Sequence, residues 1–163
     1  MDYIYIGKIV STHGIKGELR LISDFDYKEL VFKENTPVYI GKDKIKETIV
    51  TYRPHKNYDM VCLYGYNNIN DVLKYKGEKV YVVKNEVDGL NKKVTKQELI
   101  GFDVYLYDEK VGTVRDIYSA GNNNCIVEIK KENGKKVLAP FALIDKVDVS
   151  NKQIIFKGGI IDA

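Results

Sequence analysis

The chain has 163 residues, with 26 basic and 23 acidic side chains and a formal net charge of +3 at pH 7. This length suits one large domain or two small ones. The nearly balanced charge excludes a histone-like polycation, so affinity for nucleic acid has to come from local clusters of Lys and Arg. No apolar run reaches the ~18 residues of a membrane-spanning helix, and the first six residues are too short for a secretory signal.

The two cysteines, Cys62 and Cys125, lie far apart in apolar strand patterns. They permit a disulfide in an oxidising compartment. Two buried thiols in a cytoplasmic protein explain them better.

Alternation of apolar and polar residues dominates the first half of the chain. Because this period is typical of half-buried strands, we predict strands at residues 3–10, 18–22, 37–40, 45–53, 60–64 and 79–83. Six short strands favour a small closed β-barrel, since closure removes exposed sheet edges. A helix between a capping Asn70 and a terminating Gly77 is expected to cover one end of this barrel.

Residues 85–95 are polar, rich in turn formers and have little to bury. We predict that they link two domains, at residues 1–84 and 96–163; a long loop within one domain is the alternative. After them, strands are predicted at residues 99–107, 111–118, 125–130, 137–140 and 153–156, with Asn133 and Gly134 indicating a type I′ turn. The predicted fold class is therefore all-β, with two small β-barrels in tandem.

The segment from Gly7 to Arg20, GKIVSTHGIKGELR, reads as two strands joined by a tight loop. Gly14 and Gly17 suit a backbone with positive φ or a close approach of another chain segment. The loop places His13, Lys16 and Arg20 on a rigid strand pair. No nucleophile–base–acid set accompanies them, so they fit a binding surface better than an active site.

A second basic loop contains Arg53, His55 and Lys56. If both loops emerge at one end of the barrel, their cations and histidines make one patch that suits phosphate groups. The alternative is that turns are polar and basic in any protein. Tyr58 and its neighbours Tyr52 and Tyr64 could stack on bases, although core or barrel-surface positions explain them better.

Catalytic and metal-binding patterns are weak in this sequence. His13 and His55 fall in different hairpins without metal-ligand spacing, and neither a phosphate loop nor a dinucleotide fingerprint occurs. We therefore expect no metal, no cofactor and no catalysis, with an RNA-processing enzyme as the alternative.

Pro140 and Phe141 end one of the later predicted strands. A proline followed by an exposed aromatic residue can serve as a protein contact. A strand that stops at a barrel corner, with Phe141 in the core, explains the same residues.

Taken together, these motifs resemble the RimM family of bacterial ribosome maturation factors over essentially the whole chain. The segment from Gly7 to Arg20 is the specific part of the resemblance. The basic residues from Arg53 to Lys56 and the helix ending at Gly77 fall where the family has similar features. Leu99–Gly101, the Val111–Val114 hairpin and Pro140–Phe141 resemble its C-terminal PRC-barrel domain.

The resemblance implies a translation-factor-like N-terminal barrel followed by a PRC barrel, in a cytoplasmic, monomeric assembly factor without catalysis or cofactors. Its partners would be the head of the immature 30S subunit, the 3′ domain of 16S rRNA, and a head ribosomal protein, the nineteenth of the small-subunit series. A PRC-type adapter that binds protein without RNA is a further alternative. The tyrosine pair that many members carry before the Leu-Ile-Gly motif is replaced here by Thr95, Lys96 and Gln97, so the protein contact linked to that pair does not transfer.

The predicted site has two parts. The contact with ribosomal protein is assigned to Pro140 and Phe141. The contact with ribosome or RNA is assigned to His13, Gly14, Lys16, Gly17, Arg20, Arg53, His55 and Lys56.

Overall fold

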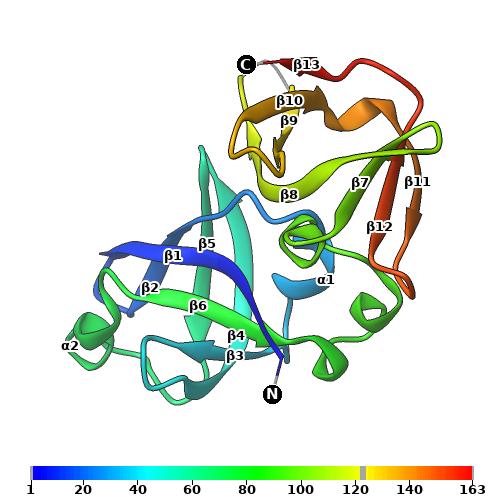
Figure 1. Ribbon diagram of the computed structural model, residues 1–163. Coiled ribbons are helices and arrows are strands. Elements are labelled where there is room, and N and C mark those ends of the chain that lie inside the picture. The colour runs from blue at the N-terminus through cyan, green and yellow to red at the C-terminus, as the bar shows by residue number, and fades with distance from the viewer. Residues whose placement is uncertain (1, 122–123, 163) are drawn as a thin grey trace. The chain divides into compact units, whose positions relative to one another are not determined.

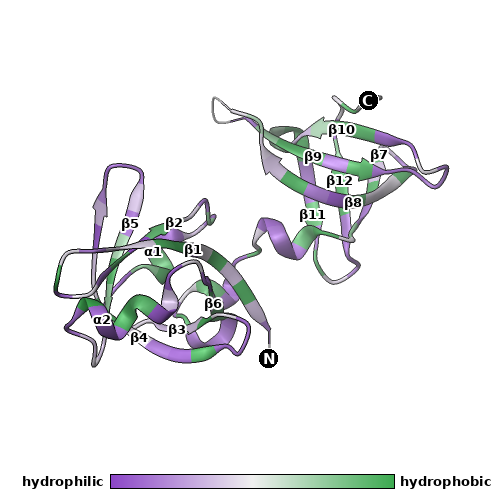
Figure 2. Cartoon of the chain, turned by 90° about the vertical axis from the view of Figure 1, so that its left-hand side faces the viewer, coloured by the Kyte–Doolittle hydropathy of each residue, from purple (hydrophilic) through white to green (hydrophobic). Residues whose placement is uncertain are grey.

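The computed structural model describes residues 2–121 and 124–162, and its chain forms two compact units, Met1–Val94 and Thr95–Ala163 (Figure 1). Hydrophilic and hydrophobic residues alternate along the strands of both units, as Figure 2 shows. This alternation is the period by which the sequence predicts the strands.

The first unit is a closed antiparallel barrel with the strand order β1-β2-β5-β4-β3-β6. Its strands are β1 (Tyr3–His13), β2 (Glu18–Ile22), β3 (Pro37–Ile40), β4 (Ile45–His55), β5 (Tyr58–Leu63) and β6 (Lys79–Val83). The ring closes through pairs such as Ile4 with Val82 between β1 and β6. The predicted six-stranded closed barrel is confirmed.

Apolar side chains from alternate positions fill the barrel. The interior is lined by Ile9, Leu19, Leu21, Phe32, Val38, Ile40, Ile49, Val61, Leu63 and Val80. Because successive side chains in a strand point to opposite faces, residues between these positions, such as Arg20 and Met60, point outward.

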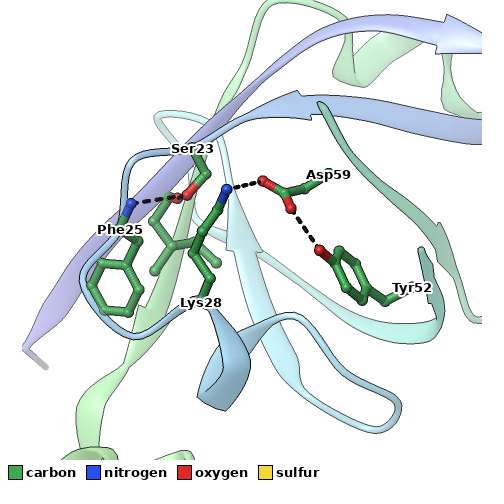
Figure 3. Close-up of polar contacts among 6 residues, drawn as sticks. Ser23, Phe25, Lys28, Tyr52 and Asp59 are labelled. Atoms are coloured by element: carbon green, nitrogen blue, oxygen red, sulfur yellow. Dashed lines mark hydrogen bonds and ion pairs between the residues drawn. The ribbon is translucent and has the colours of Figure 1, made fainter. Parts of the chain in front are cut away.

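A short helix that the sequence analysis missed, α1 (Lys28–Val31), packs on the barrel with Val31 fully buried. Lys28 Nζ lies 2.7 Å from Asp59 Oδ2, and the Tyr52 hydroxyl donates a 2.7 Å hydrogen bond to Asp59 Oδ1 (Figure 3). Asp59 is only 4% exposed, so these two partners compensate for the loss of water around its carboxylate. Burial and this hydrogen bond raise the pKa of Tyr52 to about 12.

Ser23 joins the segment before α1 to the barrel. Its hydroxyl donates to the Ile6 carbonyl at 2.5 Å and accepts from the Phe25 N–H at 3.2 Å (Figure 3).

A second short helix, α2 (Ile69–Val72), continues as a 3₁₀ turn through Tyr75. It starts two residues earlier than predicted, because Asn68 rather than Asn70 is the cap. The Asn68 side chain accepts a 2.8 Å hydrogen bond from the Asn70 N–H. Val72 and Tyr75 are buried and anchor the helix to the barrel.

The segment 85–95 buries more than its composition suggested. It forms short 3₁₀ helices at Lys84–Glu86 and Leu90–Lys92, and Val87 and Leu90 join the core of the first unit. The expectation of little to bury here is wrong, because two buried apolar residues are enough to anchor an otherwise polar segment to the core of the first unit.

The second unit is a seven-stranded sheet with the order β11-β12-β7-β8-β9-β10-β13. Its strands are β7 (Asp103–Leu106), β8 (Glu109–Ser119), β9 (Cys125–Lys130), β10 (Lys136–Pro140), β11 (Ile144–Asp148), β12 (Gln153–Phe156) and β13 (Ile161–Asp162). All neighbours are antiparallel except β12 and β7. Its buried residues include Val104, Val127, Ile129, Ile154 and Phe156.

The strands β11 and β13 lie outside the five strands predicted for this unit, and two local details also differ from expectation. The sequence predicts a strand that begins at Leu99. In the structure Lys96–Leu99 is a 3₁₀ helix, and the strand β7 begins at Asp103. The hairpin at Gly134 is not type I′, because Gly134 has a φ of +83° while Asn133 keeps a negative φ. Cys62 and Cys125 are half-buried thiols in different units.

Candidate nucleic-acid interface

Four neighbouring strands of the barrel carry a cluster of basic and aromatic side chains on their outer face. Pairing between strands places Ser11 beside Arg20, Arg20 beside Met60, and Met60 beside Arg53. We call this cluster the basic wall; it consists of His13, Glu18, Arg20, Arg53, His55 and Tyr58.

Arg20 is held by two uncharged partners. Its Nη2 lies 2.8 Å from His13 Nδ1, and its guanidinium carbon lies 5.0 Å from the centre of the Tyr58 ring. Because an arginine can only donate, Nδ1 of His13 accepts this hydrogen bond and carries no proton. The positive charge of Arg20 is thus oriented without being neutralised by these partners.

Arg53 is held differently, by a carboxylate. Its Nε and Nη2 donate to the two oxygens of Glu18 at 2.9 and 2.7 Å, the two-pronged geometry that is characteristic of Arg and carboxylate. The hydrogen bond lowers the pKa of Glu18 and raises that of Arg53. The Arg53 side chain is 48% exposed and that of Glu18 is 16% exposed, so the guanidinium still faces solvent.

His13 and His55 meet across the wall, with ring centres 6.0 Å apart. They start from diagonally opposite corners of the four-strand patch, and sheet twist brings such corners together on one face. Burial, followed by the nearby charges of Arg53 and Lys56, lowers the pKa of His55. His55 is therefore neutral at pH 7.

Met60 lies at the centre of the wall. It points outward but has no exposed surface, and its neighbours on both sides are Arg20 and Arg53. Long arginine side chains can cover apolar neighbours with their aliphatic stems. The register thus places a buried apolar residue between the two arginines.

The two predicted loops do not emerge at one end of the barrel, so the condition for a single patch that includes both lysines is not met. Since β2 and β5 are antiparallel, the turn with Lys16 and the turn with Lys56 lie at opposite ends of this strand pair. Both lysines are exposed. Lys56 itself adopts a positive φ of 56° in its turn.

Gly14 and Gly17 shape the first turn as expected, with φ of +73° and +85°. A side chain at Gly17 would also meet the backbone oxygen of Asn68 at 3.0 Å. The Ile69 N–H donates to the Ile15 carbonyl at 2.9 Å. The turn with Lys16 is therefore fixed against the start of α2.

Pro140 and Phe141 lie in the second unit, at the end of β10 and the start of a 3₁₀ turn. Phe141 is half-buried and lies under Lys96 Nζ, 5.5 Å from its ring centre. It is therefore not the fully buried core residue of the alternative reading.

Sequence reasoning missed two members of the wall's chemistry. Glu18 was read only as part of the motif, although its spacing of two from Arg20 puts both on one face. Its partner Arg53 lies 35 residues away, so the pair could be found only from the strand order. Tyr58 was considered for base stacking, and instead it supports Arg20.

Among the described residues no group of three or more His, Cys, Asp and Glu side chains is placed to hold a metal ion. Within the same part of the chain, no helix is long and apolar enough to cross a membrane.

The fold and the wall define a two-domain all-β protein with a cationic surface on its first domain. Residues 4–87 match the RimM N-terminal domain, and residues 91–159 match the PRC-barrel domain. The chain belongs to the RimM family.

Relatives of similar length carry one name. A protein of Exiguobacterium sp. named "Ribosome maturation factor RimM" is 35% identical over 169 residues, which cover 99% of this chain and 98% of the relative. Proteins with the same name from Bacillus mycoides and Halalkalibacterium halodurans are 35% and 32% identical, over 91% and 93% of this chain and 91% and 92% of the relatives.

Proposed function

We propose that this chain is a ribosome maturation factor that binds precursors of the small ribosomal subunit and performs no bond chemistry. The observation that carries the proposal is the similarity, over nearly the full chain, to relatives with that name. The basic wall supplies a physical basis. Arg20 is oriented by His13 and Tyr58 and keeps its charge, which suits it to an RNA phosphate.

The proposed mechanism is a shift of population among folding states of the RNA. A factor that binds a partly folded head of the 30S subunit better than the mature head favours the productive intermediate. It leaves when its binding surface disappears. In this proposal the target is the 3′ domain of 16S rRNA, and the factor acts as a monomer in the cytoplasm.

The test measures binding of the full chain to a transcript of the 16S 3′ domain over a series of salt concentrations. Replacing Lys16, Arg20 and Arg53 together by Ala should weaken binding and flatten its salt dependence, by about 0.7 in logarithmic slope for each lost phosphate contact. A control with Lys42, Lys135 and Lys157 replaced by Ala removes the same charge elsewhere. Equal losses in both variants, or no loss in the first, would contradict an RNA contact at the wall.

We also propose that Pro140 and Phe141 contact the nineteenth ribosomal protein of the small-subunit series. Phe141 is partly exposed in the 3₁₀ turn that follows β10, as a protein contact requires. Binding of the purified ribosomal protein should weaken with Phe141→Ala and not with the Lys16, Arg20 and Arg53 triple variant. If the triple variant alone lost this binding, the assignment of partners to units would be wrong.

One observation favours a second candidate function, cleavage of RNA. Two histidines with ring centres 6.0 Å apart stand beside two arginines, and His is the commonest general acid or base. Incubation of the protein with precursor rRNA separates the candidates. Product that increases with the amount of protein and disappears in His13→Ala would overturn the non-catalytic proposal.

A further inference from the structure

The Glu18 carboxylate occupies the part of the wall that an RNA phosphate would need. It takes two hydrogen bonds from Arg53, at 2.9 and 2.7 Å. A phosphodiester offers a guanidinium the same kind of two-pronged acceptor as a carboxylate does. The two acceptors therefore compete for one donor pair.

The accessibility of the two side chains permits such an exchange. Arg53 is 48% exposed, whereas Glu18 is only 16% exposed. An incoming phosphate can thus reach the guanidinium from the solvent side while the carboxylate stays in the wall. Arg53 has only to change its partner and does not have to leave its place on β4.

The charge balance of the wall sets the sign of the effect. Arg20 and Arg53 contribute two positive charges, Glu18 contributes one negative charge, and His55 is neutral at pH 7 because its pKa is lowered. The carboxylate thus removes about half of the attraction that the arginines exert on a polyanion. It also holds the Arg53 fork in one orientation before the ligand arrives, which reduces the ordering cost of binding.

We infer that Glu18 is an internal competitor of RNA phosphate for Arg53, and that their exchange sets the affinity of the basic wall. This inference rests on the proposed RNA-binding function. In the complex, an RNA phosphate accepts the two hydrogen bonds of Arg53, and Glu18 loses them. The wall therefore binds RNA less tightly than its arginines alone would allow, which suits a factor that must dissociate.

The test is Glu18→Gln in the full chain, with the 16S 3′-domain transcript as probe. Gln has the same shape and keeps an acceptor for Arg53 but has no charge. Binding should tighten several-fold, and the logarithmic salt slope should steepen by about 0.7, the value for one additional phosphate contact on single-stranded RNA. Glu29→Gln on α1 is the matched control, because it changes the net charge equally at an exposed position outside the wall.

A second pair of variants isolates the exchange. In an Arg53→Gln background, Glu18→Gln should increase the affinity for the transcript no more than Glu29→Gln does. Glu18→Asp keeps the charge but shortens the side chain, so it should loosen the pair and tighten RNA binding at unchanged net charge. Thermal unfolding of each variant identifies any that fails to fold, and Glu18→Asp then carries the test.

The outcomes separate this inference from the function on which it rests. If the Lys16, Arg20 and Arg53 triple variant loses RNA binding while Glu18→Gln behaves like Glu29→Gln, the exchange is wrong and the function stands. If Glu18→Gln binds more weakly, Glu18 supports binding and the inference is likewise overturned. If the wild-type chain does not bind the transcript, the proposed function itself fails.

Discussion

Arg20 in the first unit and Arg115 in the second both extend from barrel or sheet strands, but their partners differ in charge. Arg20 is held by the imidazole of His13 and the ring of Tyr58. Arg115 lies 3.4 Å from Glu128, and Lys136 lies 3.6 Å from the same carboxylate. The two arginines thus present different surfaces, because Arg20 is oriented by neutral groups whereas Arg115 is paired with a carboxylate on the neighbouring strand.

The two units also close their sheets differently. In the first unit the strand pairings form a complete ring, and the outer face of four strands carries the wall. In the second unit the pairings form a row from β11 to β13. A ring fixes each strand on both sides, which suits a surface whose side chains must be held in place.

The largest expected effect tests whether the units fold separately. Leu19 is fully buried in the barrel, and Ile154 is fully buried in the second unit. Either residue replaced by Ala should lower the free energy of unfolding of its own unit by about 2–5 kcal/mol, since a cavity remains. Calorimetry of the full chain should show one transition moved by Leu19→Ala and the other by Ile154→Ala. A single transition that moves equally in both variants would show that the two units unfold together.

A smaller effect is expected from the two glycines of the first turn. Gly14→Ala meets open space but requires a left-handed backbone, which costs about 1–2 kcal/mol. Gly17→Ala carries the same cost and also brings a methyl group within 3.0 Å of the Asn68 oxygen, so it should destabilise the first unit more. Chemical denaturation of both variants checks the order. Equal losses would mean that the turn is not fixed against α2.

The sequence alone predicts most strands of both units, because alternation and turn residues are local signals. All six barrel strands were located within a few residues, and the barrel followed from their number. The packing of Val87 and Leu90 in the core of the first unit is not predicted, since two apolar residues in a polar segment give no periodicity. The helix α1 is not predicted either, because its four residues are too few for a helical pattern to show.

In the candidate site, too, local features can be predicted from the sequence and long-range contacts cannot. Motif and spacing identify the turn residues and the basic side chains. They do not reveal that His13 and His55 meet, because this depends on the order β1-β2-β5-β4 and on twist. They also give no reason to expect a buried Met60 on an outer face, since one of its two lateral neighbours, Arg20, lies on a strand that is distant in sequence.

The contrast between the two arginines can be tested with one matched pair. Arg20→Ala should weaken binding of the 16S 3′-domain transcript roughly tenfold, which corresponds to one charge-assisted hydrogen bond of about 1.5 kcal/mol. Arg115→Ala removes the same side chain from a position already paired with Glu128, and binding should stay near the wild-type value. Filter binding or fluorescence anisotropy at fixed salt measures both. Equal losses would show that pairing with a carboxylate does not decide which cation meets RNA.

The smallest expected effect concerns pH and also uses the second unit as a reference. The chain has two histidines, His13 and His55, and both lie in the first unit. Because burial and nearby cations lower the pKa of His55 in the folded state, the unfolded chain takes up a proton first as the pH falls below ~6.5. The stability of the first unit should therefore decrease from pH 7 toward about 5.5, while the transition of the second unit lacks any histidine contribution.

Affinity for RNA should move in the opposite direction over the same interval. A bound phosphate favours the protonated imidazole, so binding takes up a proton and tightens modestly as the pH falls. Glu18 stays ionised there because Arg53 lowers its pKa, which keeps the competing carboxylate constant. His55→Asn should flatten both the stability profile and the affinity profile in calorimetry and RNA titrations. If the affinity profile keeps its slope in this variant, the proton is taken up elsewhere, and His55 is not in contact with the phosphate.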